Sequence, residues 1–380
     1  MAVVVIGVAG VLFATTASGG PNAPLAPKPP AAQVTYTPAI AATDVDPHTK
    51  AAVTATGGKI VEVKLTSEKG GDVEGKISPD GTRWEASGPL RYGATYQWLG
   101  AVEDPDGTRA PLQGIFTTKA PTKTVRGTLN IGDGRTVGIA APIRIQFNAH
   151  VDDRAAVEKA LKVTTPTPIE GSWGWLPDEG GGSRVDYRPK DYWPANTQVK
   201  VEADLEGVDY GGGAVGAADV SSTFTIGRAQ IVKADVNSFR MIVLRDGKQV
   251  MDLPASYGLG ADPERNTRSG IHVVTEKFTD KRMVSERYRY DVMEKWAVRI
   301  SNNGEFIHAN PVSAAAQGSS NVTHGCVNLS IDNARAYYDT ALYGDPVEVT
   351  GTPVQLGPKD GDIWDWTVPW AQWKTMSALD

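Results

Sequence analysis

The sequence predicts a mainly β protein, in which two tandem β-sandwich modules precede a third, β-rich region. Glycine (41) and proline (25) are abundant among the 380 residues, which favours many turns over a helix bundle. Short segments alternate polar and apolar residues, as in KIVEVKL at 59–65. Turn pairs such as Asp80-Gly81 and Asp106-Gly107 separate such segments.

Two regions of similar length, 34–122 and 123–228, show this strand pattern in the same order. The segment GTRW at 81–84 in the first is echoed by GSRV at 182–185 in the second. We therefore predict two tandem immunoglobulin-like modules. Residues 152–161 are expected to add one or two helical turns to the second module.

The N-terminal segment is the candidate for export. Residues 1–20 combine an apolar run with a run of small residues, which predicts a signal peptide or a membrane anchor. Residues 21–33 form a proline-rich linker. We expect the rest of the chain to work outside the cytoplasm, in the cell envelope, with membrane contact only through the N-terminal segment.

Composition excludes one class of partner. The formal net charge is −6 and no run of Lys or Arg occurs, so we predict no nucleic-acid binding. Trp173 and Trp175 in the second module either stack on sugar rings or pack in a loop or interface, and packing is the commoner role.

The third region, 229–352, is predicted to form strands and to carry the chemistry. The remaining 353–380 form a tail with four tryptophans, which would be costly to leave in water. We expect this tail to dock onto the domains.

The informative segment is NVTHGCVNLS at 321–330. In an extended chain, residues two apart point to the same face, so His324, Cys326 and Asn328 are expected to line one side of a cleft. Gly325 leaves room beside the sulfur for a substrate backbone.

The chain contains a single cysteine, which is either a small buried hydrophobe or a reactive thiol. An adjacent imidazole converts a thiol into a thiolate–imidazolium pair that attacks an amide carbonyl. Both His308 and His324 are candidates, and spacing alone does not choose between them. The competing interpretation is a metal site formed by these two histidines and Cys326. Because no acidic residue or second cysteine lies near in sequence, we predict no metal and no cofactor.

At these residues the sequence resembles the L,D-transpeptidase catalytic domain, the YkuD family. The family's signature is a histidine, a spacer, and then [Ser/Thr]-His-Gly-Cys-x-Asn. Here His308, the spacer 309–322 and the segment THGCVN at 323–328 match it. The resemblance extends over the whole third region. It is strongest to multi-domain members with two immunoglobulin-like modules and a Trp-rich tail.

The resemblance implies a role for each signature residue. Cys326 matches the nucleophile and His308 the general acid and base. His324 and Gly325 match the part that shapes the oxyanion hole. Asn328 matches a polar residue that supports the substrate site.

The resemblance also implies a mobile flap over the donor pocket, which we place at 282–304. Met283, Tyr290 and Trp296 fall where that flap contributes substrate-binding side chains, although packing within the flap is an equally good interpretation. One position departs from close relatives, which carry Ser where this chain has Ala309. We expect the backbone carbonyl of this residue to orient the catalytic imidazole, so that alanine serves as well.

The function that the resemblance implies is a peptidoglycan L,D-transpeptidase. It would take a donor tetrapeptide stem, release D-Ala, hold the acyl group as a thioester, and form a 3→3 cross-link with an acceptor stem. Carbapenems would act as inhibitors. The alternatives are an L,D-carboxypeptidase, in which water resolves the thioester, and a non-catalytic cell-wall-binding protein.

Overall fold

The computed structural model describes residues 31–68, 71–358, 360 and 363–379. The described residues form two compact units that divide near residue 119. The predicted export segment, 1–20, and most of the predicted linker lie outside the described residues. No helix in the described ranges has the length and apolar character needed to cross a membrane.

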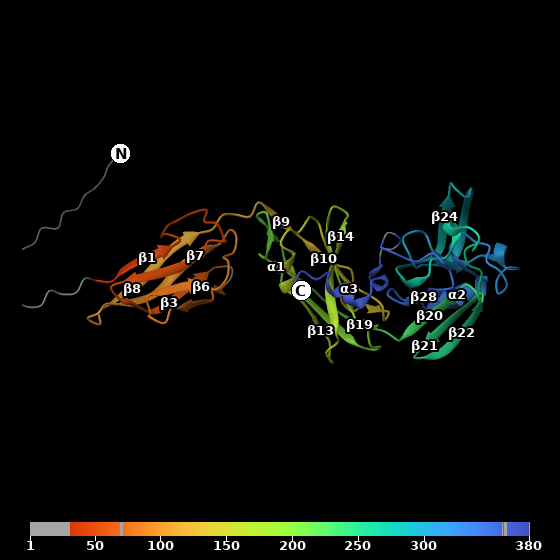
Figure 1. The fold of residues 1–380 in the computed structure, drawn as a ribbon, viewed down its shortest axis with the longest axis horizontal. Coiled ribbons are helices and arrows are strands. Elements are labelled where there is room, and N and C mark those ends of the chain that lie inside the picture. The colour runs from red at the N-terminus through yellow and green to blue at the C-terminus, as the bar shows by residue number, and fades with distance from the viewer. Residues whose placement is uncertain (1–30, 69–70, 359, 361–362, 380) are drawn as a thin grey trace, which may run out of the picture. The chain divides into compact units, whose positions relative to one another are not determined.

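The first unit is a β-sandwich (Figure 1). Burial alternates along its strands, as at Tyr96 and Trp98, because successive side chains point to opposite faces. The rings of Trp84 and Trp98 meet edge to face at 5.4 Å between the sheets. One sheet contains, in spatial order, β1 (Gln33–Thr37), β2 (Ala52–Thr56), β6 (Arg83–Ala86) and β5 (Gly75–Ile77). The facing sheet contains β4 (Gly71–Asp72), β3 (Lys59–Ser67), β7 (Thr95–Glu103) and β8 (Arg109–Thr117).

The second module belongs to the second unit and is also a sandwich. One sheet contains β10 (Gly127–Leu129), β12 (Ile143–Phe147), β15 (Gly182–Pro189) and β14 (Gly171–Glu179). The facing sheet contains β11 (Thr136–Val137), β19 (Val220–Ile226), β16 (Gln198–Ala203) and β13 (Leu161–Thr164). A small sheet at one end contains β17 (Asp209–Gly211), β18 (Ala214–Gly216) and β9 (Lys123–Val125).

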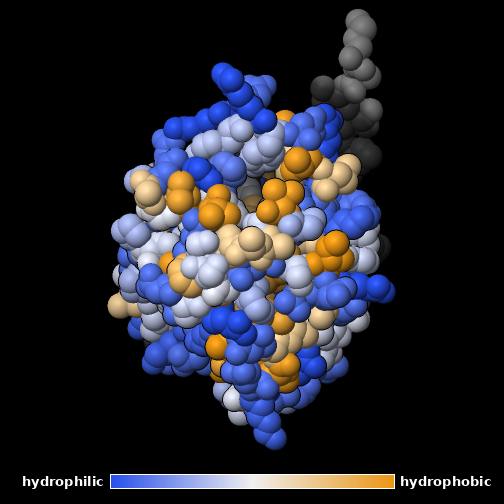
Figure 2. All heavy atoms as spheres, turned by 90° about the vertical axis from the view of Figure 1, so that its right-hand side faces the viewer, coloured by the Kyte–Doolittle hydropathy of each residue, from blue (hydrophilic) through white to orange (hydrophobic). Residues whose placement is uncertain are grey.

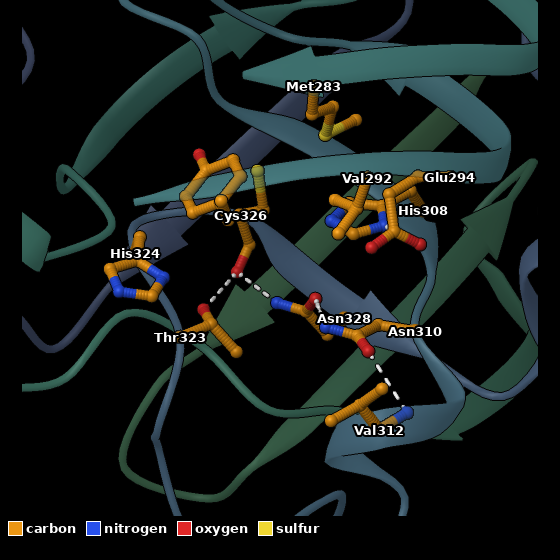
Figure 3. A pocket seen from close by; sticks show the side chains of 11 residues that line it. Met283, Val292, Glu294, His308, Asn310, Val312, Thr323, His324, Cys326 and Asn328 are labelled. Atoms are coloured by element: carbon orange, nitrogen blue, oxygen red, sulfur yellow. Dashed lines mark hydrogen bonds and ion pairs between the residues drawn. The ribbon is translucent and has the colours of Figure 1, made fainter. Parts of the chain in front are cut away.

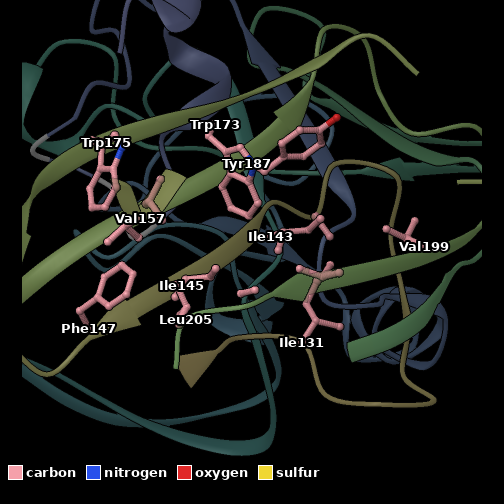
Figure 4. Packing of buried hydrophobic residues seen from close by; sticks show 14 of the residues in the cluster. Ile131, Ile143, Ile145, Phe147, Val157, Trp173, Trp175, Tyr187, Val199 and Leu205 are labelled. Atoms are coloured by element: carbon pink, nitrogen blue, oxygen red, sulfur yellow. The ribbon is translucent and has the colours of Figure 1, made fainter. Parts of the chain in front are cut away.

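The predicted tandem immunoglobulin-like architecture is confirmed, and so is the short helix. The helix is α1 (Arg154–Lys159), which begins after Asp153, whose side chain accepts a hydrogen bond from the Ala156 amide. Trp173 and Trp175 are only 7% and 6% exposed and pack in the module's core, with Trp175 stacked on Phe147 (Figure 4). They therefore have the packing role and not the sugar-stacking role.

The third region contains two sheets that enclose a common core within the part of the chain described. One contains β22 (Lys248–Pro254), β21 (Arg240–Arg245), β20 (Gln230–Asp235), β28 (Pro346–Thr350) and β23 (Gly270–Val273). The other contains β24 (Glu276–Ser285), β25 (Tyr290–Arg299), β26 (Phe306–Ala309) and β27 (Val327–Leu329). Helix α2 (Ile331–Thr340) packs on this second sheet, and Ser330 caps it by accepting from the Asn333 amide. Short 3-10 turns occur at η1 (Pro263–Arg265) and η2 (Pro311–Ser313).

The tryptophan-rich tail docks, as expected. It contains η3 (Asp365–Thr367) and α3 (Trp370–Lys374). Trp373 is fully buried and donates to the carbonyl of Ser172, and Trp366 donates to that of Ala140, so the tail is fixed to the second module. The Arg188 guanidinium lies 4.8–5.2 Å from the ring centres of three tail tryptophans, a favourable cation–π geometry.

Candidate active site

Parallel pairing of β26 and β27 brings the two halves of the signature together. His308 on β26 lies in register with Asn328 on β27. Cys326 immediately precedes β27, so the sulfur comes to the side of the sheet where the His308 ring lies. Cys326, His308, His324 and Asn328 all line one cavity of about 250 Å³ (Figure 3).

The segment before β27 is bent and not extended, which corrects our sequence-based geometry. Gly325 has φ +115°, in the region that favours glycine, so the two-residue alternation does not run through it. The Cys326 carbonyl accepts from Thr323 Oγ1 at 3.0 Å and Asn328 Nδ2 at 2.8 Å (Figure 3). The predicted side chains share a cavity because these hydrogen bonds hold the bend.

The buried side chain of Asn328 stabilises this bend through hydrogen bonds. Its side chain is 1% exposed and also bonds the Ser256 carbonyl and the Asn310 amide. With both ends of its amide engaged, Asn328 fixes the backbone of Cys326, which fits the supporting role implied for it.

Cys326 is partly exposed, and its Sγ lies 3.5 Å from the Gly304 carbonyl. The ring of His308, which is 4% exposed, lines the same cavity as this sulfur. His308 Nδ1 lies 2.9 Å from the carbonyl oxygen of Ala309. The expectation that the backbone of Ala309 orients the imidazole is therefore confirmed.

Opposing effects act on the pKa of His308. Burial alone would lower its pKa, but hydrogen bonds and negative charge from Cys326 and Glu294 raise the pKa of His308 to about 10. Glu294 Oε2 lies 3.5 Å from Nδ1. The arrangement favours the imidazolium form of His308.

His324 has a different environment. Its ring packs against those of Tyr288 and Tyr290, at 4.4 and 5.5 Å between centres. Burial, followed by the nearby charge of Arg265, lowers the pKa of His324, so this ring stays neutral where His308 is charged.

The β24–β25 hairpin forms a wall of the cavity and contains the first part of the predicted flap. Met283 and Tyr290 line the cavity, as expected. Trp296 does not. It has φ +54° at a bulge in the pairing of β25 with β26, and its ring packs on Tyr338 of α2 at 5.3 Å. Strict alternation along β25 would have placed Trp296 on the cavity face, and the bulge turns it away.

A second cavity, of about 370 Å³, also opens at Cys326. Met283, Tyr290 and His324 line both cavities, so the flap and the histidine separate them. In the face that Figure 2 shows, small hydrophobic patches lie among hydrophilic side chains. Two spaces that meet at one sulfur suit a reaction between two substrates.

Sequence reasoning missed three residues at the site. Glu294 follows Tyr290 at even spacing on β25, so alternation along the strand was a signal for it. Asn310 lies two residues beyond His308 and lines the cavity. Tyr288 lies in the hairpin turn, where no periodicity applies.

The remaining candidates are placed as follows. His272 on β23 is fully buried, and its ring nitrogens lie near the carbonyls of Arg268 and Ile300, so it is held inside the fold. In the described part of the chain, no group of three or more His, Cys, Asp or Glu side chains is arranged to hold a metal ion.

Comparison with known proteins covers both the modules and the third region. A family model described as a bacterial Ig domain matches residues 42–209, and one described as the L,D-transpeptidase catalytic domain matches 229–349. The chain is 53% identical over 353 residues to L,D-transpeptidase 5 of Mycobacterium tuberculosis, covering 92% of this chain and 78% of that protein. It is 36% identical to L,D-transpeptidase 2 of the same species, covering 86% of this chain and 80% of that protein.

A solved structure adds a bound ligand to the comparison. The LD transpeptidase LdtMt1 in complex with imipenem has 31% identity and a TM-score of 0.51. The match covers 60% of this chain and 100% of that chain.

Proposed function

The chain belongs to the L,D-transpeptidase family, and on that premise we propose that it forms 3→3 cross-links between peptidoglycan stem peptides through a thioester on Cys326. The observation that carries the proposal is the shared cavity of Cys326 and His308, a buried imidazole held by the Ala309 carbonyl. This pair supplies a nucleophile and a proton donor on one side of a cavity.

The first half of the proposed reaction is acylation. The Cys326 thiolate attacks the carbonyl of the third donor residue, and the backbone amides at Gly325 and Cys326 stabilise the developing oxyanion. The His308 imidazolium gives its proton to the departing amine, so that D-Ala leaves as the neutral amine and the acyl group remains as a thioester.

The second half is aminolysis. The side-chain amine of a diamino acid on the acceptor stem attacks the thioester, and His308 takes the proton that this amine loses. The new amide forms as the carbon–sulfur bond breaks, which restores the thiolate–imidazolium pair. The two cavities that meet at Cys326 support this two-substrate scheme.

Carbapenem inhibition follows from the same chemistry. A strained β-lactam carbonyl is an acyl donor for a thiolate, and its amine stays tethered after ring opening, so the acyl-enzyme persists. The imipenem bound in a solved relative supports a carbapenem adduct on Cys326. No cofactor enters the scheme.

An extracytoplasmic location in the cell envelope is part of the proposal. It is supported by the predicted export segment at 1–20 and by the substrate, which lies outside the membrane.

The test is mass spectrometry of muropeptides after incubation with the pure protein and with Cys326→Ala. We expect cross-linked dimers and free D-Ala from the native protein only. Tripeptides without dimers would identify an L,D-carboxypeptidase. If a folded native protein gave no product and Cys326 did not react with iodoacetamide near neutral pH, a non-catalytic wall-binding role would replace the proposal.

A further inference from the structure

A half-buried carboxylate lies beside the proposed acid–base residue and has no step of its own in the reaction. Glu294 is 15% exposed at its side chain, and its Oε2 lies 3.5 Å from His308 Nδ1. The same nitrogen lies 2.9 Å from the Ala309 carbonyl. Two acceptors therefore converge on one imidazole nitrogen, and Figure 3 shows one of them, Glu294, beside His308.

The backbone of β25 explains how Glu294 reaches this place. Tyr290, Val292 and Glu294 alternate on one face of the strand, and all three line the Cys326 cavity. Register with β26 then shifts between Lys295 and Val298. The bulge ends the cavity-facing series at Glu294, which becomes its innermost member.

The bulge is strained, and helix α2 holds it. Trp296 has φ +54°, a conformation that bulky side chains rarely adopt. Its ring is fixed between Tyr338, at 5.3 Å, and the Arg335 guanidinium, at 5.2 Å. Strain that surrounding contacts maintain beside an active site points to a function.

We propose that Glu294 is a positioning residue that holds His308 as an imidazolium, with its Nδ1–H directed at the Glu294 carboxylate and the Ala309 carbonyl. The inference rests on the proposed roles of Cys326 and His308. The carboxylate makes His308 a proton donor over a wider pH range than the Ala309 carbonyl alone would provide.

The charges around His308 support this role. Cys326, before β27, and Glu294, on β25, are the groups that raise the pKa of His308 against the effect of burial. Tyr290 and His324 line the same cavity. Helix α2, which packs on β25 and β26, carries Arg335 over the Trp296 ring. Acylation leaves the Glu294 carboxyl group unchanged, whereas it converts the Cys326 sulfur into a thioester.

That difference matters for the acyl-enzyme. Once the sulfur is in a thioester, it no longer contributes a negative charge to His308. Glu294 then remains to orient the ring and to accept its Nδ1–H while His308 takes a proton from the incoming amine. We therefore expect Glu294 to influence aminolysis as well as acylation.

The direct test is the titration of the His308 ring, followed by ¹⁵N NMR in protein with labelled histidine. Replacing Glu294 with glutamine, E294Q, should lower the titration midpoint of His308 by about one pH unit, because a close opposite charge has been removed. E286Q, which neutralises an exposed glutamate in the turn of the same hairpin, is the matched control and should leave the midpoint unchanged. An unchanged midpoint in E294Q would overturn the inference.

A conservative variant separates charge from shape. E294D keeps the carboxylate and should titrate between the native protein and E294Q. Equal midpoints in E294D and E294Q would show that charge is not the cause and would also overturn the inference. The alkaline limb of the pH–rate profile for carbapenem acylation should move down with the midpoint.

The outcome is separable from that of the proposed function. If the native protein made no cross-linked product, the proposed function would fail, yet the ring titrations would still decide the role of Glu294. If cross-linking occurred and E294Q titrated like the native protein, only the inference would fail.

Discussion

The two histidines of the signature share a cavity but occupy opposite kinds of environment. His308 is 4% exposed and faces a thiol and a carboxylate, which raise its pKa. His324 lies against two tyrosine rings and near an arginine, and its pKa is lowered. One environment stabilises a cation and the other excludes it.

The comparison shows that the spacing of a motif does not assign acid–base roles. Both histidines belong to the signature that contains Cys326, and both line its cavity. Only the partners of each ring decide which one carries a proton at neutral pH. The assignment of His308 as the acid–base residue therefore rests on Glu294 and Cys326, which lie on separate strands and loops from it.

The two histidines should differ most in the loss of transpeptidation rate when each is replaced by alanine. His308→Ala should lower the rate of transpeptidation by about 10²–10⁴, the usual range for loss of a general acid–base group. His324→Ala should cost less, about two- to tenfold for each of its two aromatic pairs, because such a pair is worth about 0.5–1.5 kcal/mol. Steady-state rates with a defined muropeptide would measure both. Comparable losses in the two variants would break the assignment.

His272→Ala is the control for this pair. It lies outside the cavity and should chiefly lower thermal stability, because it leaves polar groups of the interior without their partner. A loss of rate in the folded His272→Ala protein as large as that in His308→Ala would show that the wrong base was chosen.

The pH dependence is the next largest effect. Because the folded pKa of His308 is raised from 6.5 to about 10, the imidazolium persists through neutral pH and is lost as the pH rises through about 10. We expect single-turnover acylation by imipenem to hold its rate across neutral and mildly alkaline pH and to fall above that point. His324→Ala should leave this alkaline limb in place.

The pKa of His324 is shifted in the opposite direction, and this shift affects the pH dependence of stability. Its lowered pKa means that the unfolded chain binds the proton more tightly, so stability is lost as the pH falls through the usual imidazole range. The stability advantage of the native protein over His324→Ala should therefore be largest near neutral pH and shrink as the pH falls, which thermal unfolding of both proteins at several pH values would measure.

Much of this molecule was predictable from local patterns. Alternation and turn residues gave the β modules, and the tail's tryptophans required burial. The signature placed Cys326 and His308. What failed was the extension of alternation through irregular backbone. The bend at Gly325 is bonded by Asn328, which distant hydrogen bonds to Ser256 and Asn310 hold in place, and the bulge at Trp296 packs on α2. No sequence period reports such contacts.

The smallest expected effect on activity is that of Tyr290, which packs on His324. Tyr290 also lines both cavities, and the proposed reaction gives it no proton to transfer. Tyr290→Ala should therefore slow carbapenem labelling of Cys326 by about 2- to 10-fold, the equivalent of one aromatic pair.

The labelling rate, followed by intact mass, should retain its native pH profile in Tyr290→Ala, because the partners of His308 are unchanged. Trp296→Phe is the matched aromatic variant on the other face of the same strand, where the ring contacts α2. It should leave labelling within about twofold of native if the remaining ring keeps most of that contact. A shifted pH profile in Tyr290→Ala would mean that the two histidines are coupled through the flap, and their environments could then no longer be treated as independent.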